Sequence, residues 1–339
     1  MESSKKILVT GGAGYIGSHT VVALIKAGFE PIIVDNFSNS EPWILEQLCK
    51  LTGRAVKYYT IDCNDKKSLQ EVFIKENIHS VIHFAALKAV GESIEQPLKY
   101  YQNNINSLLC LIELMEAYGV ENLVFSSSCT VYGEADYLPV NEIHPIKKAE
   151  SPYGYTKQVC ENIITDCLKS KKLKRKVTLR YFNPIGAHSS GLIGELPIGT
   201  PNNLVPFITQ TAAGKRDVLT IFGNTYNTPD GTCIRDYIHV MDLADAHVRS
   251  LITMSEKNNS YTLNIGTGKG HSVLDVIQSF EKVNQIKLNY KIGPKREGDI
   301  EQIYAATNLA EKTLKWKANY SIDVAMKDAW RWQQYLSKK

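Results

Sequence analysis

The chain has 339 residues, of which 43% are hydrophobic and 22% charged, and its formal net charge is +4 at pH 7. This composition excludes a disordered chain and suits a soluble globular protein with one large or two closely joined domains. The small net charge argues against a dedicated nucleic-acid surface.

The first predicted element is an apolar strand at Ile7-Leu8-Val9, which leads into a glycine-rich turn and a helical pattern that ends at Gly28. The glycines at 11, 12, 14 and 17 satisfy both Gly-x-x-Gly-x-x-Gly and Gly-x-Gly-x-x-Gly. Such spacing permits a tight turn, close approach of the backbone to a pyrophosphate, and close packing of helix on strand. We therefore predict a dinucleotide site with the diphosphate at the positive end of the helix.

A second buried strand at 31–34 ends in Asp35, eighteen residues after Gly17. A carboxylate at this position can accept both hydroxyls of the adenosine ribose and would repel a 2′-phosphate. The sequence therefore favours NAD over NADP.

Strands and helices continue to alternate along the next 150 residues. Further strands are predicted at 56–61, 81–85, 123–125 and 177–182, and helices at 66–76, 98–117 and from 152. This alternation predicts an α/β protein with a doubly wound parallel Rossmann sheet. Ligands bind beyond the carboxyl ends of such strands, where the glycine turn, Asp35, Asp62, Phe84 and residues 126–128 all fall.

The stretch Ser151-Pro152-Tyr153-Gly154-Tyr155-Thr156-Lys157 predicts the start of a helix, with serine as N-cap and proline at the first helical position. Tyr153 and Lys157 then lie one turn apart on one face. A phenol with a pKa of about 10 is a poor base at neutral pH, but a nearby ammonium favours its ionised form. This spacing also occurs by chance on many helices, so it gains weight only beside the dinucleotide motif.

After Phe182 the chain is rich in Gly, Pro, Asn and Thr up to residue 235, which predicts a smaller and more irregular α/β region. A strand at 235–240, a helix at 242–251 and a strand at 263–265 follow, with helices at 273–283 and 322–336. We expect one domain over 1–183, with a return segment near 236–265, and a second domain over 184–339.

Further features bear on partners, redox state and localisation. The basic run at 169–176 is interpreted as a solvated loop, and the seven cysteines, without a Cys-x-x-Cys pair, as reduced thiols with no metal site. Residues 1–6 lead directly into a strand without a signal-peptide core, and no segment reaches membrane-spanning length. We therefore expect a cytoplasmic protein with no membrane or nucleic-acid partner.

With both motifs in register, the chain resembles the extended short-chain dehydrogenase/reductase family from about residue 5 to its C-terminus. The resemblance is closest to the members that invert carbon 4 of UDP-hexoses. It is carried by residues 10–19, 84–92, 125–133, 179–187, 201–206 and 234–247.

The resemblance implies interconversion of UDP-glucose and UDP-galactose in galactose metabolism, through hydride transfer to tightly bound NAD and a 4-keto sugar that rotates and is reduced on its other face. Tyr153 would be the base, its pKa lowered by Lys157 and the nicotinamide, and Lys157 would also hold the ribose hydroxyls. Ser128 would hydrogen-bond the reacting sugar hydroxyl. A homodimer joined through helices at 98–117 and 152–169 is also implied.

The resemblance assigns further residues to each ligand, and makes residues 184–339 the UDP-sugar-binding domain. For NAD these are Gly11, Gly14, Tyr15, Ile16 and Gly17 at the pyrophosphate, Asp35 and Asn36 at the ribose, Asp62 and Cys63 at the adenine, and Phe84, Ala85, Lys88 and Asn103 around them. For the UDP-sugar they are Asn183, Asn203, Leu204, Phe222, Arg235, Tyr237, Arg296 and Asp299.

Three positions depart from the family pattern. Ala86 replaces a usual glycine, and Cys129, beside Ser128, replaces a usual alanine. Because Cys63 and Cys129 both fall at expected site positions, we hypothesise that they make the enzyme sensitive to thiol reagents. Ile303 occupies a position that influences entry of N-acetylated sugars, and its intermediate size leaves open whether UDP-N-acetylglucosamine and UDP-N-acetylgalactosamine are substrates.

Two other functions remain as alternatives. A nucleotide-sugar dehydratase or decarboxylase shares the Tyr-Lys pair, but dehydratases of this kind carry an Asp-Glu pair where this chain has Cys129-Thr130. A non-catalytic NAD sensor is disfavoured because Ser128, Tyr153 and Lys157 occur together.

Overall fold

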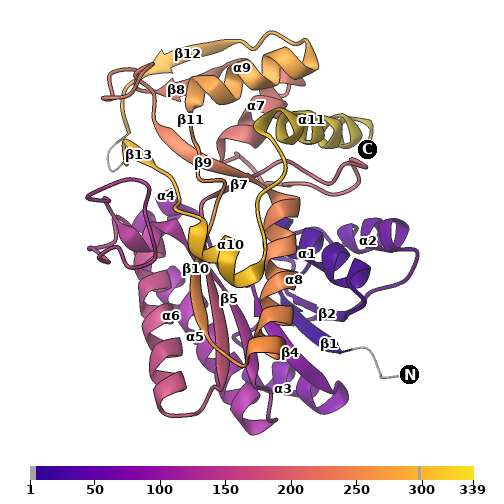
Figure 1. Ribbon diagram of the computed structural model, residues 1–339. Helices are drawn as coiled ribbons and strands as arrows, with labels where there is room; N and C mark the ends of the chain where they lie inside the picture. Colours follow the sequence, from indigo (N-terminus) through magenta and orange to yellow (C-terminus); the bar gives the residue numbers. More distant parts are fainter. Residues whose placement is uncertain (1–4, 297–298) are drawn as a thin grey trace.

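The structure is a computed structural model that describes residues 5–296 and 299–339. Its centre is a seven-stranded parallel sheet in the order β10-β6-β5-β4-β1-β2-β3 (Figure 1). The strands are β1 (Lys6–Thr10), β2 (Glu30–Asp35), β3 (Lys57–Thr60), β4 (Ile78–His83), β5 (Asn122–Ser128), β6 (Arg175–Tyr181) and β10 (Tyr261–Ile265). The predicted doubly wound α/β fold is confirmed.

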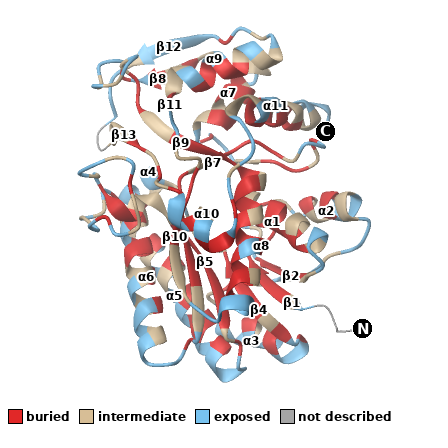
Figure 2. Cartoon of the chain, viewed as in Figure 1, coloured by how far each residue is buried: buried red, intermediate tan, exposed pale blue. Residues whose placement is uncertain are grey.

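Helices cover both faces of this sheet because its strands are apolar on both sides. Successive residues of β1 alternate between two cores: Ile7 and Val9 pack with α1 and α8, whereas Leu8 packs with α3, α5 and α6. Figure 2 shows the strands buried between the helices. The helices around the sheet are α1 (Tyr15–Lys26), α2 (Ile44–Thr52), α3 (Lys66–Lys75), α4 (Val90–Glu95), α5 (Pro97–Ala117), α6 (Pro152–Lys169) and α8 (Val240–Lys257).

A smaller layer of strands and helices lies beyond the carboxyl ends of the large sheet (Figure 1). Strand β9 (Ile234–His239) is flanked by β7 (Asn183–Ile185), β11 (Gly270–Ser272) and β13 (Gln302–Ile303), while β8 (Leu219–Phe222) pairs with β12 (Tyr290–Gly293). The remaining helices are α7 (Leu204–Ala212), α9 (Val273–Asn284), α10 (Asn308–Leu314) and α11 (Ile322–Lys338). The apolar faces of α7, α9 and α11 form a separate core with these strands, whereas α10 packs against α8 and β10 in the core of the large sheet.

The segment after residue 233 crosses between the two layers. Strand β9 belongs to the small sheet, α8 packs on the large sheet, and β10 pairs with β6 as the seventh strand. The sequence did not predict α2, α4, α7, α10 or the short strands β7, β8 and β11–β13. Most of these are too short to show a helical or strand period of their own.

Within the described ranges, no helix is both long and apolar enough to cross a membrane. The basic run at 169–176 is only partly the predicted loop, because Lys169 ends α6 and residues 175–176 begin β6; Lys172 lies 3.1 Å from Glu116 and Arg175 lies 2.5 Å from Glu121. These carboxylate partners neutralise much of the local charge.

Candidate active site

The glycine turn between β1 and α1 leaves the start of α1 open. Gly14 is the N-cap, and no side chain caps this helix. Gly11 has a φ of +69°, and a Cβ on Gly17 would lie 2.2 Å from the Gly11 carbonyl oxygen. Glycine is therefore required at both positions, and the free N–H groups of the first turn form an anion site. The chain thus offers what the diphosphate of NAD requires.

Asp35, at the end of β2, holds this turn in place. Its carboxylate accepts hydrogen bonds from the N–H groups of Ala13 (3.0 Å) and Phe37 (2.9 Å) and from the Ser40 hydroxyl (3.0 Å). A carboxylate has about four acceptor sites, so capacity for a ribose hydroxyl remains. The sequence identified the residue but not its structural role.

The residues expected around the adenine and its ribose form one polar network. Asp62 accepts from the side-chain amides of Asn36 (2.9 Å) and Asn64 (2.8 Å), and Asn64 also donates to Asn103. Burial alone would raise the pKa of Asp62, but the hydrogen bonds from Asn64 and Asn36 leave it below its ordinary value. Neighbouring Cys63 is buried, which raises the pKa of its thiol to about 12.

The loop after β4 faces the glycine turn. The strand ends at His83, one residue before Phe84, so Phe84 and Ala85 lie in the loop. The ideal Cβ position of Gly11 is 2.9 Å from the Ala85 nitrogen, which brings loop and turn into contact. Farther along, the Lys88 ammonium lies 6.0 Å from the centre of the Tyr15 ring.

The Tyr153 helix begins as predicted. The Ser151 hydroxyl accepts from the Gly154 N–H (3.1 Å), and Pro152 is the first helical residue of α6. The Lys157 ammonium, buried under this helix, donates to the Ser126 carbonyl (2.7 Å) and lies 5.9 Å from the centre of the Tyr153 ring. Because an ammonium has three donors, it can also bind ribose hydroxyls.

The pKa values of the pair differ from the sequence-based expectation. Burial raises the pKa of Tyr153 to about 12, and a hydrogen bond with Ser128 offsets only part of this shift. Burial also lowers the pKa of Lys157 to about 8. At neutral pH the chain therefore holds a charged lysine beside a neutral phenol, and a further positive charge is needed to ionise Tyr153.

Two arginines converge where the UDP diphosphate is expected. Arg235, on β9, lies 3.9 Å from Asp299, and Arg296 donates to the same carboxylate at 3.0 and 3.2 Å. The Arg296 guanidinium also lies 4.8 Å from the centre of the half-exposed Phe222 ring. Guanidinium groups match phosphate oxygens, and an exposed ring can stack on a base.

Four other expected substrate residues lie in the small layer. Asn183 opens β7 and pairs with the buried Tyr237 on β9, while Asn203 is the N-cap of α7 and Leu204 its first residue. The Asn203 amide donates to Glu195 (2.6 Å) and so does not cap its helix. The same Glu195 oxygen lies 3.4 Å from the Lys88 ammonium, which links the two predicted ligand sites. Sequence reasoning missed Glu195, which is 107 residues from Lys88.

The departures from the family pattern lie close to these groups. Cys129 follows Ser128 in a 3-10 turn, and burial raises the pKa of its thiol to about 12, so both hypothesised thiols are weakly nucleophilic. Ile303 is buried against Val131 and Phe182 and is paired with Arg235 across β13 and β9. Ala86 is partly buried in the loop after β4.

The chain is similar to known proteins over nearly its whole length. The model of the GDP-mannose 4,6 dehydratase family matches residues 8–329. UDP-glucose 4-epimerase of Bos taurus is 49% identical over 337 residues, which cover 98% of this chain and 97% of that protein. The epimerase of Pasteurella multocida is 49% identical over 328 residues, or 97% of each chain.

Solved structures of similar proteins share the fold over nearly the whole chain. A UDP-glucose 4-epimerase from Stenotrophomonas maltophila, with bound NAD and formylated UDP-arabinopyranose, has a TM-score of 0.96 and 45% identity over 98% of this chain and 99% of its own. The enzyme from Bifidobacterium longum, in complex with NAD+ and UDP, has a TM-score of 0.95 and 44% identity over 98% of both chains.

Proposed function

The chain belongs to the UDP-glucose 4-epimerases of the extended short-chain dehydrogenase/reductase family, and from this we infer that it is an NAD-dependent isomerase that interconverts UDP-glucose and UDP-galactose. The observation that carries the inference is the convergence of Ser128, Tyr153 and Lys157 at the carboxyl end of β5, on the same side of the sheet as the open glycine turn after β1. Ser128 is followed by Cys129-Thr130, which leaves no carboxylate there to expel water as a dehydratase must.

We assign the proton transfer to Tyr153, whose phenol oxygen takes the proton of the sugar 4-hydroxyl and later returns it. NAD bound by these residues would supply a reversible hydride acceptor for carbon 4 and, in its oxidised form, a positive charge near the phenol. Lys157 adds the second positive charge and holds the ribose. Ser128 orients the sugar hydroxyl toward Tyr153.

The remaining predicted residues hold the two ligands. The diphosphate of NAD is assigned to Gly11, Gly14, Tyr15, Ile16 and Gly17, and its adenosine to Asp35, Asn36, Asp62 and Cys63. Phe84, Ala85, Lys88 and Asn103 complete that site. For the UDP-sugar the proposed residues are Asn183, Asn203, Leu204, Phe222, Arg235, Tyr237, Arg296 and Asp299. Two arginines on the diphosphate would anchor UDP while the 4-keto hexose rotates.

The domain division follows from these assignments. We assign NAD to the Rossmann domain over residues 1–183, with a return near 236–265, and the UDP-sugar to residues 184–339. Residues 1–4 and 297–298 lie outside the described ranges.

The test is incubation of the purified protein with UDP-galactose and no added cofactor or reductant. UDP-glucose should appear, and Tyr153→Phe should abolish turnover while NAD stays bound. A 4-keto-6-deoxy sugar as product would instead indicate a dehydratase. Bound NAD without turnover would indicate a sensor.

We also propose that the enzyme is a cytoplasmic homodimer that serves galactose metabolism. Apolar side chains on α5 and α6 support the dimer, because Leu98 is 73% and Tyr155 49% exposed. Light scattering should give twice the mass of one chain, and Leu98→Glu should yield monomers. Ile74→Glu, at a 58% exposed position on α3, is the matched control and should leave the dimer intact.

The range of sugars is proposed to depend on Ile303. Because this side chain is buried in the small core that it forms with Val131, Tyr132 and Phe182, a larger residue would narrow the space beside it. Turnover of UDP-N-acetylgalactosamine relative to UDP-galactose should fall in Ile303→Tyr. An unchanged ratio would remove Ile303 from the specificity site.

A further inference from the structure

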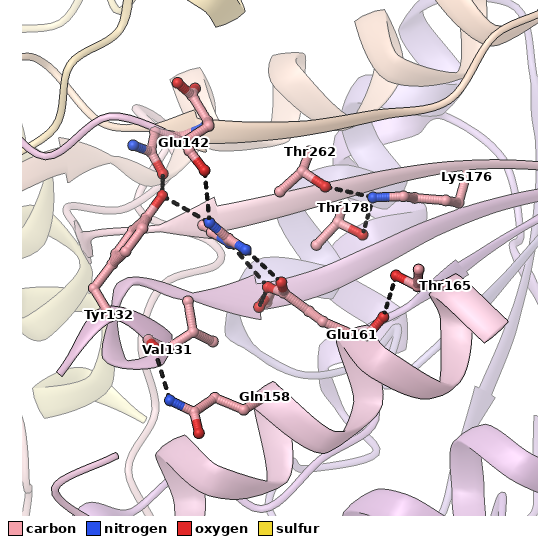
Figure 3. Close-up of polar contacts among 12 residues, drawn as sticks. Val131, Tyr132, Glu142, Gln158, Glu161, Thr165, Lys176, Thr178 and Thr262 are labelled. Atoms are coloured by element: carbon pink, nitrogen blue, oxygen red, sulfur yellow. Dashed lines mark hydrogen bonds and ion pairs between the residues drawn. The ribbon is translucent and has the colours of Figure 1, made fainter. Parts of the chain in front are cut away.

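Helix α6 carries a third functional position beyond the tyrosine and the lysine. Tyr153, Lys157 and Glu161 follow one another at intervals of four residues and so form one stripe on the helix. The Glu161 side chain is only 12% exposed and accepts two parallel hydrogen bonds from Arg180, at 3.0 and 2.6 Å (Figure 3). This paired geometry is the strongest form of a carboxylate–arginine contact.

The stripe is matched residue by residue by the three serines at the end of β5. The Lys157 ammonium donates to the Ser126 carbonyl, and the Ser127 hydroxyl donates to Glu161 at 2.5 Å. The third serine, Ser128, interacts with Tyr153. Three positions of α6 are therefore attached to the last three residues of β5, the strand that carries the proposed substrate serine.

Arg180 extends this arrangement to the neighbouring strands. It lies opposite Ser127 in the β5–β6 pairing, is almost fully buried, and donates to the Tyr132 hydroxyl at 3.0 Å. Tyr132 in turn donates to Asn264 on β10 at 2.6 Å, so the contacts join α6 to three strands. Glu161 has its partners 34 residues before it and 19 after it in the chain.

We propose that Glu161 and Arg180 are positioning residues of the reaction centre: they hold α6 in register on β5 and β6, and the Glu161 carboxylate keeps the Lys157 ammonium charged. The inference rests on the proposed epimerase function.

The electrostatic part follows from the groups that face Lys157. These are Tyr153, Cys160 and Glu161 on α6 and His83 on β4, as far as the described residues extend. Burial raises the pKa of Tyr153 to about 12 and that of Cys160 to about 11, so both are neutral in the chain at pH 7. Burial also lowers the pKa of His83 to about 3. Burial lowers the pKa of Lys157 to about 8, and the interactions with Cys160 and with Glu161 oppose that shift.

Three variants separate charge from geometry. Glu161→Gln keeps the shape but removes the charge and leaves Arg180 unpaired. Glu161→Gln combined with Arg180→Gln restores local neutrality, and Glu161→Asp keeps the charge on a shorter side chain. The control is Glu76→Gln, which removes a buried carboxylate that pairs with Lys6 and Lys57 away from α6.

The measurement is kcat and KM for UDP-galactose between pH 6 and 10, with retained NAD and Tm for each protein. Lys157 must be protonated, so a lower pKa should move the alkaline limb of kcat to lower pH. In Glu161→Gln we expect the midpoint of the alkaline limb to move down by about one pH unit, which lowers kcat about tenfold at a given pH on that limb. The double variant lacks the same carboxylate and should show the same shift, whereas full recovery would assign the shift to the unpaired Arg180 and contradict the role of Glu161. Glu161→Asp should lower kcat with the limb unmoved, and Glu76→Gln should lower Tm alone.

An equal loss of kcat at every pH in Glu161→Gln, or wild-type kinetics in that variant, would overturn the inference. If Glu161→Gln does not fold, a Glu161→Asp variant with wild-type kcat would overturn the positioning role. A wild-type protein inactive on UDP-galactose would refute the proposed function and this inference with it, whereas an active wild type with an unmoved limb refutes the inference alone.

Discussion

Replacement of Gly17 by alanine should disrupt the turn proposed to bind NAD. The added Cβ would lie 2.2 Å from the Gly11 carbonyl oxygen and 2.8 Å from the Gly12 Cα. A normal contact between carbon and oxygen is about 3.3 Å, so helix and turn must separate by about 1 Å. Both contacts are to backbone atoms, which cannot move aside as a side chain can. Overpacking of this kind costs about 1–3 kcal/mol.

The consequence should appear in NAD binding as well as in stability, since the displaced atoms form the start of α1. A misplacement of about 1 Å can cost about 10²-fold in activity. We expect Gly17→Ala to be purified with little NAD, measured by mass spectrometry of the ligand released on denaturation, and with a lower Tm. Gly91→Ala is the control, because a Cβ at this helical position meets no atom within 4 Å. Wild-type NAD content and Tm in Gly17→Ala would refute the reasoning.

Three further predictions concern charge and protonation. Glu195→Gln removes the negative charge beside Lys88 but keeps an oxygen that can accept from Asn203. It should therefore weaken NAD retention more than it raises KM for UDP-galactose. A larger effect on KM than on NAD retention would contradict a link between the two sites through Glu195. Burial opposes the charge of Glu76, but hydrogen bonds from two lysines and a tyrosine lower its pKa to about 2. This group should therefore contribute up to about 3 kcal/mol to the free energy of unfolding. The contribution is present above about pH 4.5 and is lost as the pH falls toward 2. The free energies of unfolding of wild type and Glu76→Gln, measured with urea, should therefore differ at pH 7 and converge near pH 2. A difference that persists at pH 2 would show that the Glu76 charge is not its cause. A thiol reagent at pH 7 should modify exposed Cys49 before Cys63 and Cys129 and leave turnover unchanged, whereas rapid inactivation would show that a site thiol is reactive.

Sequence patterns predicted the features whose conformation depends on residues close together in the chain. The glycine spacing, the acid at the end of β2 and the Ser151-Pro152 helix start each depend on a few neighbouring residues. The structure places them at one edge of the sheet because parallel strands share that edge.

The missed features depend on distant partners. Strand β10 joins β6 across about 80 residues of chain, and the Lys88–Glu195 contact spans 107, so neither leaves a periodic signal. The pKa of Tyr153 could not be predicted either. The spacing to Lys157 suggests a lowered pKa, but burial, which depends on residues distant in the chain, raises the pKa of Tyr153 to about 12.

The central claim is that the hydrogen of carbon 4 leaves the sugar and returns to it within one site. UDP-galactose carrying deuterium at carbon 4 tests this directly, in buffered H2O without added cofactor. UDP-glucose with the deuterium retained at carbon 4 is the predicted product. Loss of the label to solvent, or no conversion by protein that contains NAD, would contradict it.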